Sequence, residues 1–407
     1  MIWGRAMFDK DAAVARRLQR YIDGIGSILG NDARRASFAT YVHGLLSEGE
    51  RKSVEPMAAR ACPDEQRVDA EHQRLLHFIG VSKWDDHAVR RLAARHALAA
   101  MTSREKVTGW IVDDTGFLKQ GKHSVGVQRQ YTGSAGKITN CQVGVSLTIN
   151  TATEHLPIDF ELYLPVSWTE DAARRKEARI PEAVEFKTKP ELALGMVRRA
   201  LADGVPRGVV LADAGYGTSS DFRAELRRLE LQFSVGVEGN TKVFEVGNPV
   251  TPGGRAVSLR ALAKKLLAKG KFQRCTWREG TKKDLTASFA MVRVVACRDV
   301  RREDFQPPTA HWLLIEWRDD EDEPANYFFS NLPDTTSLQE LVSITMQRWR
   351  IERSYEDLKG ELGLDHYEGR RFQGWHHHVT VTLCCYAFLI SERVRHFSPS
   401  AGGALAH

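Results

Sequence analysis

The chain has 407 residues, 42% of them hydrophobic and 27% charged, and its 58 Lys and Arg against 52 Asp and Glu leave a net charge of +6. This length and apolar content support a sizeable core, so they exclude a disulfide-stapled mini-protein and a wholly disordered chain. The longest nearly uncharged apolar stretch, 379–390, falls short of the roughly 20 residues that cross a bilayer, and 1–10 lacks a signal-peptide pattern, so we expect a soluble, intracellular protein.

Residues 1–100 have the apolar spacing of helices, as in DAAVARRLQRYIDGIGSIL and DHAVRRLAARHALAAM, with apolar side chains three and four positions apart. We therefore predict a helical N-terminal domain. Five of its arginines are able to contact DNA phosphates, although a solvated helix face explains them equally well: Arg16, Arg17, Arg20, Arg34 and Arg35.

From Thr108 the pattern changes to β-branched runs separated by Gly, Asn and Ser, which predict a meander of three or more antiparallel strands. A helix is expected over 190–204. It leads into an apolar run that ends in Asp213, which predicts a buried strand with a carboxylate at its C-terminal end. A helix over 220–229 and a strand over 232–237 follow.

Residues 241–332 form a second β-rich block with one short helix, SLRALAKKLLAKG. Its window 251–284 holds ten Lys and Arg against Glu279 and Asp284 and is the most basic in the chain, whereas the acidic run 319–323 predicts a solvated turn. The chain closes with a helical region over 337–362 and an apolar helix over 374–395. Consecutive His376, His377 and His378 point about 100° apart on such a helix, so they do not converge on one metal ion.

The six cysteines, Cys62, Cys141, Cys275, Cys297, Cys384 and Cys385, include no CxxC pair. We interpret them as buried, reduced thiols.

Three carboxylates suggest chemistry when they are taken together: Asp113 and Asp213 at strand ends and Glu352 on a helix. Individually, such an Asp commonly caps a turn, and a Glu among arginines commonly makes surface ion pairs. Together they would form an all-oxygen site for one or two Mg²⁺ ions. Two such ions about 4 Å apart assist an in-line phosphoryl transfer, which favours nuclease or strand-transfer chemistry.

On a regular α-helix Arg348, Glu352, Tyr355 and Lys359 would share one face, because they are spaced at i, i+4, i+7 and i+11. Arg348 would then orient the Glu352 carboxylate, and Lys359 would lie where a DNA phosphate passes. A structural ladder of ion pairs is the alternative that this spacing leaves open.

The segments TMQRWRIERSYEDLKGELGLDHYEGR, VDDTGFLKQGKHSVGVQRQYTG and VLADAGYG resemble bacterial insertion-sequence transposases of the DDE class. The resembling branch carries a β-rich insertion in a ribonuclease H-like core, and its signature is Tyr, two residues, Arg, three residues, Glu, six residues, Lys. Arg348, Glu352 and Lys359 match this signature, whereas Thr345 occupies the Tyr position. Any phosphate contact of that Tyr is therefore in doubt here.

The resemblance implies that Asp213 is the second catalytic acid and Glu352 the third. An Asp-x-Thr pattern assigns the first acid to Asp113 and a direct Asp-Thr pairing assigns it to Asp114; we favour Asp113. Only one of these neighbours faces the site if the strand is regular. The implied cofactor is a pair of Mg²⁺ ions, for which Mn²⁺ substitutes, held by Asp113, Asp213 and Glu352.

Residues after the first acid lie on an expected hairpin beside the cleaved phosphate, or simply on an exposed polar hairpin. Trp168 is able to stack on a flipped base, although ordinary packing explains it as well. The full set of expected DNA contacts is Lys119, Lys122, His123, Arg129, Trp168, Lys264, Lys265, Arg348, Tyr355 and Lys359.

We therefore predict an α/β fold: a helical DNA-binding domain (1–100), the first part of a ribonuclease H-like core (101–240), a basic β-rich insertion (241–332), and completion of the core by the Glu352 helix and C-terminal helices (333–407). The resemblance implies Mg²⁺-dependent cut-and-paste transposition, with a possible hairpin intermediate. It also implies a cytoplasmic, nucleoid-associated bacterial protein that binds terminal inverted repeats and target DNA as a homodimer, away from membranes. The alternatives are a DNA nuclease without strand transfer and a domesticated, catalytically silent DNA-binding protein.

Overall fold

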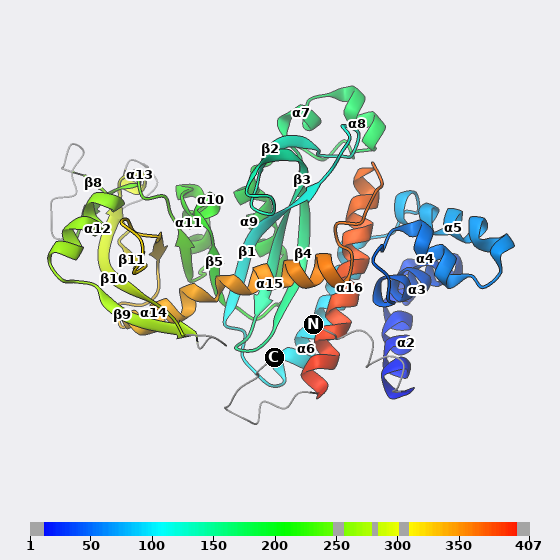
Figure 1. Cartoon of the computed structure of the whole chain (residues 1–407), viewed down its shortest axis with the longest axis horizontal. Coiled ribbons are helices and arrows are strands. Elements are labelled where there is room, and N and C mark those ends of the chain that lie inside the picture. Colours follow the sequence, from blue (N-terminus) through cyan, green and yellow to red (C-terminus); the bar gives the residue numbers. More distant parts are fainter. Residues whose placement is uncertain (1–11, 247–255, 279–283, 301–308, 397–407) are drawn as a thin grey trace. The chain divides into compact units, whose positions relative to one another are not determined.

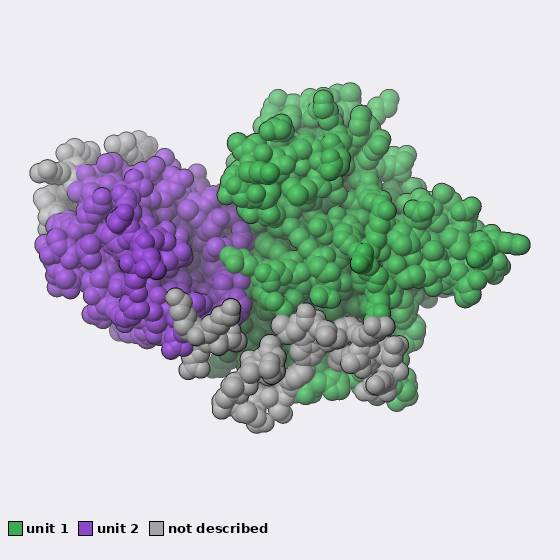
Figure 2. All heavy atoms as spheres, in the orientation of Figure 1, with its two compact units in different colours: residues 1–106, 114–203, 350–401 green, residues 107–113, 204–349, 402–407 purple. Residues whose placement is uncertain are grey.

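The computed structural model describes residues 12–246, 256–278, 284–300 and 309–396. The chain divides into two compact units, coloured separately in Figure 2. Unit 1 comprises residues 1–106, 114–203 and 350–401, and unit 2 comprises 107–113, 204–349 and 402–407. Strand β1 (Gly109–Leu118) contributes to both, because the boundary falls between Asp113 and Asp114.

Unit 1 begins with helices that bury one apolar stripe each. In the first of them Val14, Leu18, Tyr21, Ile22 and Ile25 are buried, at the spacing of an amphipathic helix. These helices, with two short 3-10 turns, are α2 (Ala12–Gly26), η1 (Ser27–Leu29), α3 (Asp32–Leu46), α4 (Val54–Ala61), η2 (Glu65–Arg67), α5 (Val68–Gly80) and α6 (Asp86–Thr102).

The C-terminal helix α16 (Phe372–His396) is the centre of this helical assembly. It runs alongside α6 in Figure 1 and also packs on α2, α3, α5 and strand β4. Most of its residues are buried, as expected for a helix that is apolar on every side. His376, His377 and His378 contact Phe372, Ile79 and Tyr41 respectively, so the expected divergence of the three rings is confirmed.

The sheet of unit 1 contains β2 (Gln128–Thr132), β3 (Lys137–Asn150), β4 (His155–Tyr163) and the C-terminal half of β1. Strand β3 pairs antiparallel with β2 and with β4 and also neighbours β1, which confirms the expected meander. The remaining elements of the unit are α7 (Val166–Thr169), α8 (Ala172–Ala178), α9 (Lys189–Ala202), α15 (Arg350–Glu356) and the π-helical turn η4 (Asp357–Glu361).

Unit 2 is built on one mixed sheet with strand order β1-β5-β6-β12-β11-β10-β7-β8, and β9 pairs with β10. The start of β1, β5 (Val209–Ala212) and β6 (Phe233–Gly236) are parallel, whereas β12 pairs antiparallel with β6. Its other strands are β7 (Lys242–Glu245), β8 (Val257–Ser258), β9 (Gln273–Arg278), β10 (Leu285–Ala296), β11 (His311–Trp317) and β12 (Asn326–Ser330). Its helices are α10 (Ala214–Gly217), α11 (Ser220–Arg228), α12 (Leu259–Ala268), α13 (Cys297–Val300), α14 (Leu338–Thr345) and the 3-10 turn η3 (Met346–Trp349).

The predicted mixed α/β fold with a helical N-terminal region is confirmed: β4, β3 and β1 are successive neighbours, and β1, β5 and β6 are parallel neighbours. That these strands form a ribonuclease H-like core stays a prediction. Range 241–332 extends the same sheet through β12, and one cluster of buried residues that includes Leu262, Val294 and Phe329 packs α12 against it.

All six cysteines are free, but Cys62 and Cys297 are half-buried where we expected burial. Among the described residues, no helix has the length and apolarity needed to cross a membrane.

Candidate active site

Asp113 and Asp213 follow directly after paired residues of two neighbouring parallel strands. The register of β1 and β5 runs from Gly109 opposite Val209 to Val112 opposite Ala212. Neighbouring strands lie about 4.8 Å apart, and side chains in register point to the same face of a sheet. The two carboxylates therefore begin from adjacent backbone positions. Asp213 lies at the end of β5 as expected, but Asp113 does not lie at a strand end, because β1 continues to Leu118.

Asp213 is also the N-cap of α10, where its Oδ1 accepts a hydrogen bond from the Gly215 amide at 2.9 Å. The turn after it requires glycine. A Cβ atom at Gly217 would lie 2.1 Å from the Gly236 carbonyl oxygen, so only glycine lets α10 approach β6 this closely. The AGYG segment thus fixes the backbone that carries Asp213.

Asp113 is paired with Arg348 within unit 2. Arg348 Nη1 donates to Asp113 Oδ2 at 2.7 Å, and the Asp113 side chain is 13% exposed. Arg348 lies in the 3-10 turn η3, before the helix of Glu352 begins. The expected orientation of the Glu352 carboxylate by Arg348 stays a prediction.

Asp114 takes a different partner from its neighbour. Its two carboxylate oxygens accept hydrogen bonds from Lys189 Nζ at 3.1 and 3.0 Å, within unit 1. Lys189 is the first residue of α9, which a capping box of Thr188 and Glu191 begins. The alternation that we expected for a regular strand is thus observed, and it gives each aspartate its own cation.

Glu352 is exposed in the first turn of α15. The predicted helical region around it is confirmed but is not regular, because η3, α15 and η4 are 3-10, α and π turns in succession. A spacing of 100° per residue therefore does not hold throughout the stretch from Arg348 to Lys359.

Tyr355 and Lys359 turn toward the sheet of unit 1. The Tyr355 hydroxyl lies 2.7 Å from the Ser146 hydroxyl, and Tyr355 is only 9% exposed. Lys359 Nζ donates to Thr115, Gly116 and Ser134. Burial lowers the pKa of the Lys359 ammonium group. Both residues, expected at DNA, therefore have protein partners in this structure.

The expected DNA contacts that follow β1 differ in how exposed their side chains are and in the protein atoms that they contact. Lys122, His123 and Arg129 are exposed, and His123 Nδ1 lies 3.0 Å from Glu177 Oε1. Lys119 Nζ donates to the Tyr367 carbonyl at 2.6 Å, and burial lowers the pKa of this lysine. Lys122 and Arg129 are thus the accessible cations of this segment.

Trp168 occupies the packed position that the sequence left open. It is 1% exposed, and its indole Nε1 donates to the Val127 carbonyl at 2.8 Å. The Arg174 guanidinium lies over its ring at 5.0 Å. A base has no access to this ring in the observed conformation, so stacking on a flipped base is corrected to core packing.

The basic window of 251–284 is partly neutralised by the acidic turn. Glu323 pairs with Arg260 at 2.8 Å and with Lys264 at 3.2 Å, and Asp319 pairs with Arg274. Lys265 pairs with Glu245 instead. The turn that we expected to be merely solvated thus contacts the basic face of α12. Residues Arg255, Glu279, Lys282 and Lys283 of this window lie outside the described residues.

A cluster that the sequence analysis did not identify lies within unit 1. His87, Asp159 and Glu161 present ligand atoms within 4.8 Å of one another. However, Arg199 pairs with both carboxylates, at 2.7 and 2.6 Å, and Arg90 pairs with Asp159 at 3.3 Å. Two guanidinium groups therefore already neutralise these acids. The alternation along β4 places Asp159 and Glu161 on one face, which was the signal available in the sequence.

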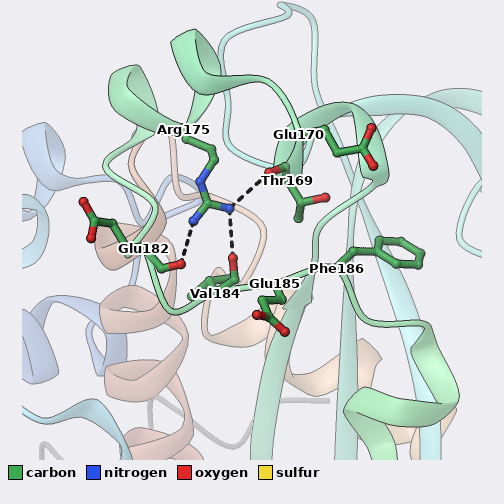
Figure 3. Close-up of a pocket in the computed structure, with 7 residues that line it drawn as sticks. All are labelled: Thr169, Glu170, Arg175, Glu182, Val184, Glu185 and Phe186. Atoms are coloured by element: carbon green, nitrogen blue, oxygen red, sulfur yellow. Dashed lines mark hydrogen bonds between the residues drawn. The ribbon is translucent and has the colours of Figure 1, made fainter.

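A pocket between α7 and the segment after α8 is shown in Figure 3. Its centre is Arg175, whose guanidinium donates to the carbonyls of Thr169, Pro181, Glu182 and Val184. Because these four bonds occupy the guanidinium, Arg175 stabilises the loop and is not directed at a ligand. The full lining is Thr169, Glu170, Arg175, Glu182, Val184, Glu185 and Phe186.

Comparison with known proteins identifies relatives of one kind. A family model described as DDE superfamily endonuclease matches residues 25–284, and one described as Transposase DDE domain matches residues 190–388. A probable transposase for insertion sequence element IS701 from Microchaete diplosiphon is 30% identical over 211 residues, which are 51% of this chain and 50% of the relative. The chain thus spans about half the length of that curated relative.

One similar solved structure is a cryo-EM structure of the piggyBac transposase synaptic complex with hairpin DNA. It has 10% sequence identity and a TM-score of 0.45, and the match covers 89% of this chain and 66% of that chain.

Proposed function

Because the chain belongs to the DDE superfamily of endonucleases, we propose that it is the transposase of a bacterial insertion sequence and cleaves DNA at the ends of its element. The observation that carries this proposal is that Asp113, within β1, and Asp213, at the C-terminal end of β5, follow directly after paired residues of these parallel strands. Carboxylates placed this way are the usual ligands of hard divalent cations.

We propose Asp113, Asp213 and Glu352 as the ligands of two Mg²⁺ ions, with Mn²⁺ as a substitute. Their all-oxygen donor set fits these ions, and family membership implies a divalent metal. When bound, the metals activate the attacking oxygen and stabilise the leaving oxygen of the phosphodiester. Asp113 is the proposed first acid because its backbone position is next to that of Asp213 in unit 2, where Arg348 holds one of its oxygens. Asp114 instead pairs with Lys189 of unit 1.

DNA binding depends on exposed Lys and Arg side chains, and cleavage and joining follow on the bound DNA. Lys122 and Arg129 contact the phosphate backbone near the cleaved bond, and Lys264 and Lys265 contact it along α12. These contacts release counterions, so affinity falls steeply as salt rises. A water molecule attacks the phosphodiester at the element end, and the freed 3′-hydroxyl then attacks target DNA, in the cut-and-paste manner, through a hairpin intermediate in some family members.

The proposed partners are the terminal inverted repeats and target DNA, bound by a homodimer on paired ends in the bacterial cytoplasm. The helical range 1–100 is the proposed end-binding domain. Arg16 and Arg20 on α2 and Arg35 on α3 are exposed and are available for phosphate contacts.

The test is cleavage of DNA that carries the flanking terminal repeats, in Mg²⁺, Mn²⁺ or EDTA, by the wild type and by Asp213→Asn. We expect cleavage at the repeat ends that requires the metal and is lost in the variant. A joining assay with target DNA separates a transposase from a nuclease without strand transfer. Binding of the ends without any cleavage, by wild type and variant alike, would favour a silent DNA-binding descendant.

A further inference from the structure

Two apolar side chains are exposed on the hairpin of β2 and β3 (Figure 1). Tyr131 and Ile138 lie directly opposite each other in the antiparallel register of these strands. Opposite residues point to the same face of a sheet, with their Cβ atoms about 5 Å apart. Tyr131 is 63% exposed and Ile138 is 61% exposed, the highest values among the large hydrophobic side chains that the structure describes. The two side chains therefore form one exposed apolar patch.

The fold directs this patch away from β1. Thr132, the residue after Tyr131, is 1% exposed and packs against Gly116 of β1. A Cβ atom at Gly116 would lie 2.0 Å from Thr132 Oγ1, so only glycine admits this contact. Because successive side chains on a strand point to opposite faces, Tyr131 points away from Gly116.

The tip of the hairpin is fixed to the same strand. Ser134 Oγ accepts a hydrogen bond from the Gly116 amide at 3.2 Å and lies 3.1 Å from Thr115 Oγ1. The Ala135 amide donates to the Thr132 carbonyl at 3.2 Å and closes the turn. These contacts hold the hairpin in place before a partner binds, so binding needs to order little additional backbone.

The charge around the patch suits a polyanion. Range 115–153 contains no Asp or Glu and four basic residues, Lys119, Lys122, Arg129 and Lys137. Arg129 is exposed two residues before Tyr131, and therefore on the same face, and Lys137 is exposed beside Ile138. A symmetric contact with a second copy of the chain would set this positive surface against itself, whereas DNA supplies the opposite charge.

We propose that Tyr131 and Ile138 insert between base pairs of the bound DNA, and that Arg129 binds a phosphate beside them. This inference rests on the proposed function and names residues that contact its DNA substrate. Apolar side chains that open a base step bend the duplex, and neighbouring cations hold the bent backbone. An aromatic ring also stacks on an unstacked base. Trp168 is buried, whereas Tyr131 is accessible to a base in the observed conformation.

The experiment uses the full chain in EDTA and duplex DNA of the repeat ends, in which 2-aminopurine replaces one adenine at a time. The fluorescence of this base analogue rises when it is unstacked. Tyr131→Ala and Ile138→Ser remove the two apolar side chains, and Tyr131→Phe keeps the ring. DNA affinity is also measured between about 50 and 200 mM salt.

Two further variants are controls. Arg129→Met removes a proposed phosphate contact. Phe186→Ala removes an aromatic ring of the same unit that is 41% exposed and lies in a pocket lined by Glu170, Glu182 and Glu185, where DNA is repelled.

We expect the wild type to raise the fluorescence at neighbouring positions of the repeat end. Tyr131→Ala should weaken binding roughly tenfold, as when one stacked base is lost, and Ile138→Ser should weaken it less. Both should lose the fluorescence rise and keep the wild-type salt slope, because neither removes a charge. Tyr131→Phe should retain the rise. The slope should fall by about 0.9 in Arg129→Met, and Phe186→Ala should match the wild type.

A fluorescence rise that persists in both Tyr131→Ala and Ile138→Ser would overturn the inference, and so would a wild type that binds the repeat ends without a rise. A wild-type dimer that forms without DNA and dissociates in Tyr131→Ala would also overturn it, by assigning the patch to a second copy. Urea unfolding verifies that the variants are folded; if Tyr131→Ala is not, Ile138→Ser tests the same face. Absence of cleavage by the wild type in Mg²⁺ would contradict the proposed function instead, and the measurements in EDTA would still decide the role of the patch.

Discussion

Arg348 and Asp113 form an ion pair at 2.7 Å, beside the point where the pairing of β1 with β5 ends. Asp213 begins from the adjacent backbone position, so two carboxylates converge on a region in which Arg348 supplies a positive charge. Like charges this close destabilise the fold unless a cation compensates them. Arg348 is therefore a protein counterion that acts before a metal binds.

The first prediction concerns this counterion. Arg348→Gln should lower the free energy of unfolding by about 1–3 kcal/mol in EDTA, the usual cost of losing a charged hydrogen bond. The loss should shrink when Mg²⁺ is present, because the metal then compensates the carboxylates. Thermal unfolding with and without Mg²⁺ measures both effects. Arg228→Gln, which affects a surface pair with Glu225 on α11, is the control and should respond equally in both conditions. Equal losses for Arg348→Gln with and without the metal would exclude this role.

The second prediction separates the two neighbouring aspartates. Asp113→Asn should abolish cleavage, whereas Asp114→Asn should retain cleavage and lose some stability, because Asp114 pairs with Lys189 at 3.0 Å. Lys189→Met should give a stability loss similar to that of Asp114→Asn, and the double variant should lose little more than either alone. Cleavage and urea unfolding of the four proteins provide the measurements. Active Asp113→Asn with inactive Asp114→Asn would assign the first acid to Asp114.

The third prediction concerns the acidic turn beside α12. Glu323→Gln should raise DNA affinity and steepen its salt dependence, because it frees Arg260 and Lys264 for phosphates. The salt slope should steepen by about one unit for each additional phosphate that the freed cations neutralise. Charge reversal of Lys264 and Lys265 should have the opposite effect. Glu230→Gln removes an exposed carboxylate away from the proposed DNA contacts and controls for net charge alone. Equal increases in affinity for both glutamine variants would mean that net charge, not the turn, limits binding.

The fourth prediction concerns acid stability. Burial, together with the nearby charges of Arg393, Arg350 and Arg353, lowers the pKa of His155 to about 3, and both ring nitrogens lack a hydrogen-bond partner within the described part of the chain. The unfolded chain takes up this proton near pH 6.5 and the folded chain does not, so stability falls as pH drops below about 6.5 toward about 3.

His155→Phe removes this titration and leaves no new polar group unsatisfied. Between pH 6.5 and 5.5 the wild type should therefore lose up to about 1.4 kcal/mol more unfolding free energy than the variant. Urea unfolding at these two pH values gives the difference. A variant as acid-sensitive as the wild type would show that His155 is protonated in the folded protein.

The sequence was sufficient for features that depend on local pattern. The apolar runs before Asp113 and Asp213 predict two strands, and the structure has both in parallel register. The predicted terminal carboxylate is confirmed for Asp213 and wrong for Asp113, because β1 continues to Leu118. The start of α9 follows from the Thr188 capping box. Alternation along β1 also predicts that Asp113 and Asp114 have different surroundings, as their separate cations confirm.

The sequence did not predict features that depend on contacts between residues far apart in the chain. Lys359 contacts Thr115 and Ser134, 244 and 225 residues earlier in the chain, and no periodicity identifies such partners. The helical spacing around Glu352 failed because 3-10, α and π turns follow one another there. Trp168 illustrates the same limit, since only the fold shows that its indole bonds to Val127.

The central claim is that Asp213 binds a catalytic metal ion, and Asp213→Cys tests it most directly. A thiolate is a poor ligand for hard Mg²⁺ and accepts softer ions more readily. With repeat-end DNA we expect this variant to be inactive in Mg²⁺ and to recover cleavage in part in Mn²⁺, whereas Asp213→Asn recovers in neither. The same fractional loss of cleavage in both metals, for a variant that remains folded, would contradict metal binding by Asp213.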